Sequence, residues 1–134
     1  MNQAHIHLIV NHVPIVGSLF ALILLAAGLL CLLAQLTGEG ATKIVQDMPR
    51  VSRALIEAHA AAAELGFWVL ESAAALALFS FLLLKNASPK ARLLALLTLV
   101  VAVLSFGLLA RAGYLGGQIR HTEIRDGFGT PDEL

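Results

Sequence analysis

Charge is scarce in this sequence. Only 13% of the residues are Asp, Glu, Lys or Arg, whereas 58% are hydrophobic. A soluble domain of 134 residues has too small an interior to bury that much apolar surface. The formal net charge is zero and no basic patch stands out, so nucleic acid is not an expected partner.

Cysteine and recognisable catalytic motifs are also nearly absent. Cys31 is the only cysteine and lies inside an apolar run, which excludes a disulfide within the chain. No segment resembles an activated nucleophile or a phosphate-binding loop. We therefore do not expect a stand-alone enzyme.

The apolar residues come in runs that are long enough to cross a lipid bilayer. They predict an all-α integral membrane helical bundle, with residues 1–134 forming one transmembrane domain. The three expected spans are about residues 13–36, 65–84 and 93–115. Pro14 either lies near the start of the first helix or kinks a helix that begins earlier.

Glycines are expected to end the first and third helices. Residues 37–40, Thr-Gly-Glu-Gly, predict a stop followed by a polar connection over 37–50. Gly116 and Gly117 predict the end of the third helix, and residues 126–134 are expected to form a flexible tail.

The second helix is predicted to be much longer than a span. Residues 51–84 would form a helix of about 50 Å, whereas the hydrocarbon core is about 30 Å thick. We expect its last part to span the bilayer and its first part to project beyond it. A tight polar turn over 85–90 then leads to an antiparallel third helix.

Lys and Arg are unequally divided between the two sides that three spans would define. The turn after the second helix carries three cations, and the first connection plus the C-terminal region carries six. The positive-inside rule then favours a cytoplasmic C-terminus. The two groups are Lys85, Lys90 and Arg92, against Lys43, Arg50, Arg53, Arg111, Arg120 and Arg125.

Three glutamates share one face of the second helix, because Glu57, Glu64 and Glu71 recur every seven residues. The antiparallel register sets Glu64 opposite Arg111 or Ala112. An interhelical ion pair between Glu64 and Arg111 is one hypothesis, and two separate side chains reaching water are the other. Glu71 lies deeper, with no cation at its level. It is expected to be protonated and packed, and the alternatives are a contact with a hydroxyl of another helix and a place in a proton route.

The first histidine group precedes the first span. His5 and His12 share a helix face, whereas His7 points elsewhere and neighbours Asn11. Histidines on one helix cannot bind opposite faces of one haem. They could hold a smaller ion such as copper, zinc or iron if the geometry bends.

The second histidine group lies at the other end. The antiparallel register brings His59 and His121 to the same side and a similar height, as the two axial ligands of a b-type haem require. Nearby glycines would leave room for a ring edge. Three interpretations stay open: haem ligation, a metal site that adds Glu57 or Glu123, and ordinary hydrogen-bonded histidines.

Four segments carry a family resemblance. Residues 7–14 (HLIVNHVP), 37–41 (TGEGA), 56–59 (IEAH) and 116–124 (GGQIRHTEI) lie in this order along the chain. They resemble landmarks of small bacterial multi-span membrane proteins grouped as a domain of unknown function, the twenty-two thirty-one group.

The resemblance implies a bacterial inner-membrane protein whose activity is unassigned. Some members are joined to c-type cytochrome modules, which favours a redox role. The polar landmarks that the resemblance carries over are His7, Asn11, His12, Glu39, Glu57, His59 and His121. Members usually have four spans, so a chain with three would place its two histidine groups on opposite sides, unless a second copy or a partner supplies a helix.

Three functions follow as hypotheses. The leading one is an electron-transfer subunit in which His59 and His121 ligate haem b and His12 ligates a second haem together with a partner chain. The second is a non-haem metal-binding membrane protein that uses His5, His7 and His12. The third is a structural or assembly subunit of a larger membrane complex. As partners, we expect either further copies of the chain in a homo-oligomer or the other subunits of a membrane redox complex.

Overall fold

The computed structural model describes residues 3–86, 88 and 90–125, with side chains from residue 16 onward. It contains three long helices: α1 (Gln3–Val45), α2 (Arg53–Lys85) and α3 (Ala91–Arg120). A 3₁₀ turn, η1 (Thr122–Ile124), follows α3, and no strand occurs among the described residues. All three helices are long and apolar enough to cross a membrane, which confirms the all-α membrane fold.

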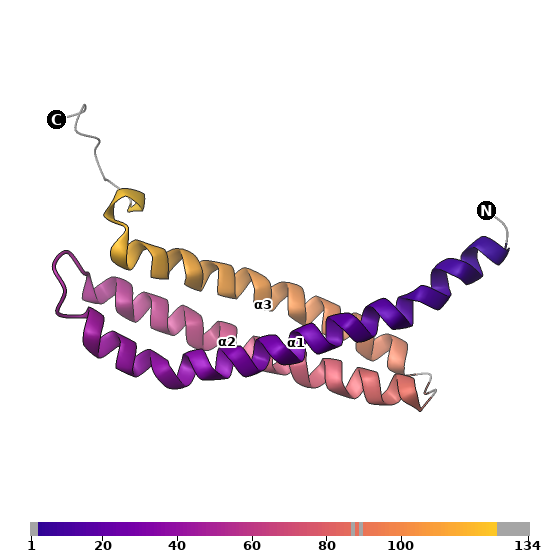
Figure 1. Ribbon diagram of the computed structural model, residues 1–134. Helices are drawn as coiled ribbons and strands as arrows, with labels where there is room; N and C mark the ends of the chain where they lie inside the picture. The colour runs from indigo at the N-terminus through magenta and orange to yellow at the C-terminus, as the bar shows by residue number, and fades with distance from the viewer. Residues whose placement is uncertain (1–2, 87, 89, 126–134) are drawn as a thin grey trace.

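The helices lie side by side as an antiparallel bundle (Figure 1). The α1–α2 connection and the end of α3 lie together at one end of the molecule. We call this the connection end. The first turns of α1 and the α2–α3 turn lie at the other end, where α1 diverges from the other two helices.

Two helices are longer than the sequence predicted. The helix α1 does not stop at residues 37–40 but continues to Val45, so only the last part of the expected 37–50 connection is non-helical. The Thr37 hydroxyl donates to the carbonyl of Leu33, and Lys43 forms an ion pair of 2.9 Å with Glu39, one turn away. Such contacts offset the roughly 1 kcal/mol cost of a glycine inside a helix.

The helix α3 likewise passes through Gly116 and Gly117 and ends at Arg120. Pro14 lies inside α1, which begins at Gln3, so the helix that begins earlier is the alternative that forms. The start of α2 has an ordinary cap, because the Ser52 hydroxyl accepts a hydrogen bond from the Leu55 N–H. The tail at 126–134 lies outside the described residues.

The contact between α2 and α3 is a seam of small residues. On α3 the buried side chains recur every seven residues, at Ala91, Thr98, Ser105 and Ala112. A seven-residue period keeps one face of a helix on its partner, and small side chains let two backbones approach closely. The buried residues of α2 include Gly66, Leu70, Ala73 and Ala77, which recur every three or four positions, and Gly66 contacts Leu109 of α3.

Gly66 shows how close this approach is. A methyl group added there would lie 2.8 Å from Cδ2 of Leu109 on α3. The pair Gly66 and Leu109 also confirms the predicted antiparallel register to within one residue. Short turns fix such a register because they leave the second helix little freedom to slide.

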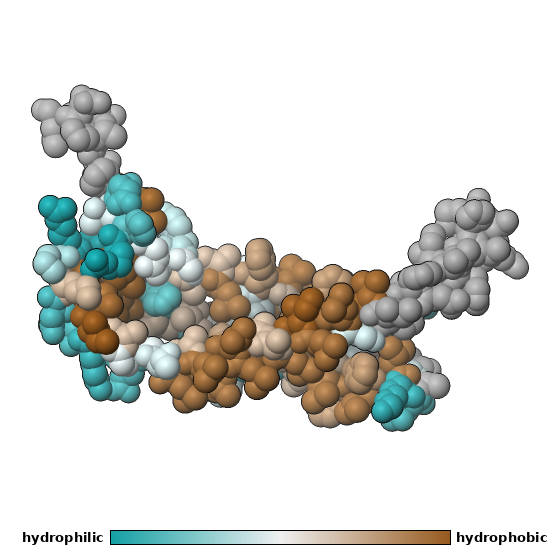
Figure 2. Space-filling model, in the orientation of Figure 1, coloured by the Kyte–Doolittle hydropathy of each residue, from teal (hydrophilic) through white to brown (hydrophobic). Residues whose placement is uncertain are grey.

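Apolar side chains cover the middle of the molecule and polar ones gather at its ends (Figure 2). Large apolar residues of α1 are exposed along its length, including Leu22 and Leu36 at 64% and 71%. An apolar cavity of about 210 Å³ lies between α1 and α2 and is lined by residues such as Leu22 and Phe81. Surfaces of this kind are stable only in contact with lipid or another apolar helix, so the chain belongs in a lipid bilayer.

Candidate functional site

The connection end brings together the second histidine group. His59 lies in the second turn of α2, and His121 directly follows Arg120, the last residue of α3. His59 is half-buried and contacts Gly116 of α3, whereas His121 is exposed. The expectation that the two histidines lie at the same end of the α2–α3 pair is therefore met.

One hydrogen bond fixes the His59 imidazole. Its Nδ1 lies 2.8 Å from the carbonyl oxygen of Ala112, which is a seam residue of α3. A carbonyl oxygen can only accept a hydrogen bond, so Nδ1 carries the hydrogen. In a neutral imidazole the other nitrogen, Nε2, then has a free lone pair. This is the form in which a histidine binds a metal or a haem iron.

Gly116 has no side chain, and the His59 ring occupies the space beside it. A methyl group added at Gly116 would lie 3.0 Å from both Nδ1 and Cε1 of the ring. The glycine therefore accommodates the imidazole itself and brings it against the backbone of α3. This differs from the expectation that glycines here leave room for a haem edge between the helices.

His121 is held in a similar way by a side chain. Its Nδ1 lies 2.7 Å from Oε1 of Glu123, which lies in η1. The backbone N–H of Glu123 itself, and then the His121 imidazole, hold the pKa of the Glu123 carboxyl below its ordinary value. An ionised carboxylate accepts hydrogen bonds, so it orients Nδ1–H and leaves Nε2 of His121 free.

Glu57 is exposed and lies two residues before His59 on α2. No group of three or more His, Cys, Asp or Glu side chains comes together in the part of the chain whose side chains are described. Glu57 therefore does not complete a three-ligand centre with the two histidines in this structure.

The first histidine group lies at the other end of the bundle. The backbone that carries His5, His7, Asn11 and His12 belongs to the first turns of α1, far from the connection end (Figure 1). Their side chains lie outside the described ones, so the predictions made for them stay predictions. The separation of the two histidine groups, which a three-helix chain requires, is present.

The hypothesis of an ion pair between Glu64 and Arg111 is wrong. The two residues stand at the same level, but both are exposed, and the described ion pairs are Glu39–Lys43 and His121–Glu123. Glu64 precedes the seam residue Gly66 by two positions, which puts it about 200° away around α2. It therefore points away from α3, so the two side chains remain separate.

Glu71 lies in the middle of the bundle and is turned toward α1. A methyl group added at Gly28 would lie 3.2 Å from its Oε1, and Cys31 lies within electrostatic reach of the carboxyl. Oε1 is buried without a hydrogen-bond partner among the described residues. The glycine in α1 thus makes the space that this carboxyl fills.

Sequence reasoning missed a second polar residue at this level. Ser105 of α3 is 1% exposed, and its hydroxyl has no hydrogen-bond partner among the described residues. The confirmed register places it opposite Leu70 and Glu71. The seven-residue spacing of small residues in α3 was the signal that could have identified it as a seam residue.

The fold and the site together define a class: a three-helix membrane protein with two oriented imidazoles at one end. No family model matches the chain, and no curated protein or solved structure is significantly similar to it. The resemblance to the domain of unknown function described above therefore stays a prediction.

Proposed function

We propose that this protein is a membrane electron-transfer subunit whose connection end binds haem b through His59 and His121. The observation that carries the proposal is shared by both residues. Each imidazole has its Nδ1 bound to an oxygen, at 2.8 Å and 2.7 Å, and neither Nε2 has a hydrogen-bond partner among the described residues. Ligand histidines are oriented by hydrogen bonds of this kind.

The donor set suits haem better than a bare metal ion. A porphyrin supplies four nitrogens, so the protein has to provide only two imidazoles. A structural zinc site, in contrast, needs four protein ligands. Because His59 packs directly on Gly116, the imidazole itself fills the space beside this glycine, and His59 and His121 are the residues that would hold the haem.

The haem would supply a reversible one-electron change at its iron, and the chain would tune that change. Hydrogen bonds to Ala112 and Glu123 make the two imidazoles better electron donors, which favours the oxidised iron. The apolar middle of the bundle provides the low-dielectric surroundings. Electrons would pass to an associated cytochrome or a quinone.

The location that fits this role is the inner membrane of a bacterium, with the C-terminus in the cytoplasm. The connection end carries six of the nine Lys and Arg residues, and the positive-inside rule favours the cytoplasmic side for it. Reporter fusions at the C-terminus, active only in the cytoplasm or only in the periplasm, test this orientation.

A titration of haemin into the purified protein tests the haem proposal. We expect a low-spin absorption spectrum that saturates at a fixed stoichiometry and is lost in His59→Ala and His121→Ala. Gly116→Ala should weaken binding, because the added methyl group displaces the His59 ring. Gly113→Ala is the matched control, since no atom lies within 4 Å of its added methyl group. Unchanged binding by both histidine variants would falsify the assignment.

One observation favours a second candidate, a structural or assembly subunit of a larger membrane complex. The helix α1 packs against α2, yet large apolar side chains remain exposed on its surface. A partner helix could cover them, and the histidines would then serve only as hydrogen-bonding residues. A colourless wild-type protein that takes up no haemin, together with co-purification in a stoichiometric complex that Leu22→Ser breaks, is the result that favours this candidate.

A non-haem metal centre that uses His5, His7 and His12 is the third candidate. Elemental analysis for copper, zinc and iron tests it directly. A bound metal that is lost in a His7→Ala and His12→Ala double variant, but kept in His59→Ala, is the expected result for that candidate.

A further inference from the structure

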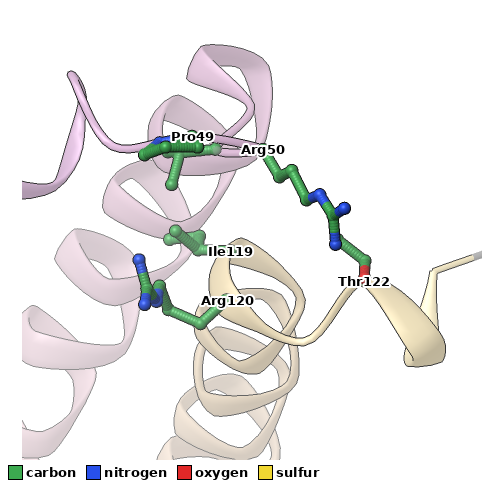
Figure 3. A pocket seen from close by; sticks show the side chains of 6 residues that line it. Pro49, Arg50, Ile119, Arg120 and Thr122 are labelled. Carbon is green, nitrogen blue, oxygen red and sulfur yellow. The ribbon is translucent and has the colours of Figure 1, made fainter.

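A cavity of about 160 Å³ lies at the connection end (Figure 3), and His59 is not among its lining residues. One wall comes from the α1–α2 connection, and the other comes from the end of α3 and the first residue of η1. Its lining residues are Pro49, Arg50, Val51, Ile119, Arg120 and Thr122. At about 30 Å³ per water molecule, the volume suits a group of roughly five heavy atoms, which is the size of a phosphate.

Arg125 holds the two walls of the cavity together. Its Nε donates to the carbonyl of Gln118 at 2.8 Å. Its Nη2 donates to the carbonyl of Ile119 at 3.1 Å and to that of Arg50 at 3.0 Å. These bonds join segments that lie far apart in the sequence, so the cavity is built into the fold rather than left by a loose loop.

Two guanidinium groups flank the cavity without a carboxylate to neutralise them. Arg50 and Arg120 both line it, and in Figure 3 their side chains extend in opposite directions, that of Arg50 toward Thr122. Neither arginine forms an ion pair within the described part of the chain. Nη1 of Arg120 donates to the thioether sulfur of Met48 at 2.9 Å. A thioether is a weak acceptor, so a stronger acceptor such as an anionic oxygen would replace it readily.

Arg50 also has an unusual backbone. Its φ of 63° lies in the left-handed region, and it is the one described residue other than glycine with a positive φ. A glycine would be favoured here, and strained residues often mark functional sites. An arginine occupies this position despite the strain, which fits a role for its side chain.

We propose that this cavity binds a phosphate group, and that the group is the headgroup phosphate of an anionic phospholipid. The guanidinium fork matches the geometry of phosphate oxygens, and the Thr122 hydroxyl adds a further donor in the lining. The cavity lies where α2 begins and α3 ends. Because both helices are long enough to span the bilayer, this is the level at which lipid headgroups lie.

Native mass spectrometry of the purified full-length protein in detergent tests the proposal, with phosphatidylglycerol, phosphatidylcholine and inorganic phosphate as separate titrants. We expect phosphatidylglycerol to bind more tightly than phosphatidylcholine. Arg120→Gln should weaken phosphatidylglycerol binding about fivefold, which is the typical effect of one cation at an anionic membrane surface.

Arg50→Gly separates binding from folding. This variant removes a guanidinium and also relieves the left-handed backbone, so it should fold at least as well as the wild type and still bind about fivefold more weakly. Arg92→Gln is the matched control, because it removes an exposed cation from the opposite end of α3 and should leave the affinity unchanged.

Equal weakening by all three variants would show a general charge effect and would overturn the site. Wild-type affinity in both Arg50→Gly and Arg120→Gln would overturn it as well. If the two variants weaken the binding of inorganic phosphate but not that of phosphatidylglycerol, the phosphate site stands and the lipid is replaced by free phosphate as its ligand.

Discussion

The pair formed by α2 and α3 differs sharply from α1, although all three helices are equally suited to a membrane. The pair buries a seam of small residues, with Ala73 and Ser105 at 0% and 1% exposure. The helix α1 has the highest proportion of exposed large side chains, and only Gly28 of its described side-chain positions is buried. The surface of α1 is therefore more apolar than that of the α2–α3 pair, and yet it is less buried.

This difference follows from the solvent. In water, the large apolar residues of α1 would drive this helix into a protein core. In a bilayer, contact with lipid tails is as favourable for these side chains as contact with a protein core. Close packing and backbone approach decide instead, and these depend on Gly, Ala and Ser. The oriented His59 also belongs to the α2–α3 pair, because only a rigid seam holds an imidazole against the carbonyl of Ala112.

The largest effect is expected from overpacking the seam. Ser105→Leu should lower the free energy of unfolding by about 3 kcal/mol, because the extra atoms find no space between the two helices. The matched control is Phe106→Leu on the next residue, which is 75% exposed and should change the stability by less than about 0.5 kcal/mol. Unfolding in mixed detergent, followed by circular dichroism, measures both. Equal effects would show that the seam is no tighter than the lipid-facing surface.

Two glycines, Gly66 in the seam and Gly107 on the exposed surface of α3, allow the same comparison between seam and surface. Gly66→Ala should destabilise the protein by about 1–2 kcal/mol, since its methyl group would lie 2.8 Å from Leu109. Gly107→Ala should be neutral or stabilise by up to about 1 kcal/mol, because nothing lies within 4 Å and alanine is the better helix former. The same unfolding measurement applies. A stabilising Gly66→Ala would mean that the two backbones are farther apart than described.

A substitution at Glu71 tests how much a buried carboxyl lowers the free energy of unfolding. Glu71→Met should stabilise the protein by about 1 kcal/mol, because Oε1 is buried with no hydrogen-bond partner among the described residues. Glu64→Met, at an exposed position on the same face, should change stability by less than about 0.5 kcal/mol. If Glu71→Met instead destabilises the protein, the carboxyl has a partner that the bundle needs.

The smallest effect concerns pH at the connection end. The folded-state pKa of Glu123 lies below its ordinary value of 4.5, so the carboxylate stabilises the end of α3 at neutral pH. This contribution is lost as the pH falls through the lowered pKa. Carbon-13 NMR of labelled glutamate should show that the Glu123 carboxyl, identified by the loss of its signal in Glu123→Gln, titrates below 4.5. A Glu123 carboxyl that titrates at or above this value would remove the argument for its contact with His121.

Much of the architecture was predictable from the sequence, because long apolar runs and short turns leave few alternatives. The three helices and the antiparallel register follow from them, and the register correctly placed His59 and His121 at the same end of the α2–α3 pair. The helix ends were not predictable from glycine alone. Residues 37–40 and Gly116 stay helical because neighbouring contacts offset the local preference to stop.

Side-chain direction was the harder part of the site. Register gave the level of Glu64 and Arg111 but not their rotation around the helix axes, so it left both alternatives open, and the separate side chains are the one that forms. The acceptor of His59 is a backbone carbonyl, which no residue pattern reveals. The role of Arg125 was likewise hidden, because its three hydrogen bonds all go to carbonyl groups.

The tautomer of His59 is the measurement that tests the central claim most directly. Nitrogen-15 NMR of histidine-labelled protein in lipid bilayers, without added haem and at a pH where the imidazole is neutral, distinguishes the two ring nitrogens. We predict a hydrogen on Nδ1 and a free lone pair on Nε2, with the His59 resonances assigned by their loss in His59→Ala. A hydrogen on Nε2 instead would contradict the bond to Ala112, and with it the orientation on which haem binding depends.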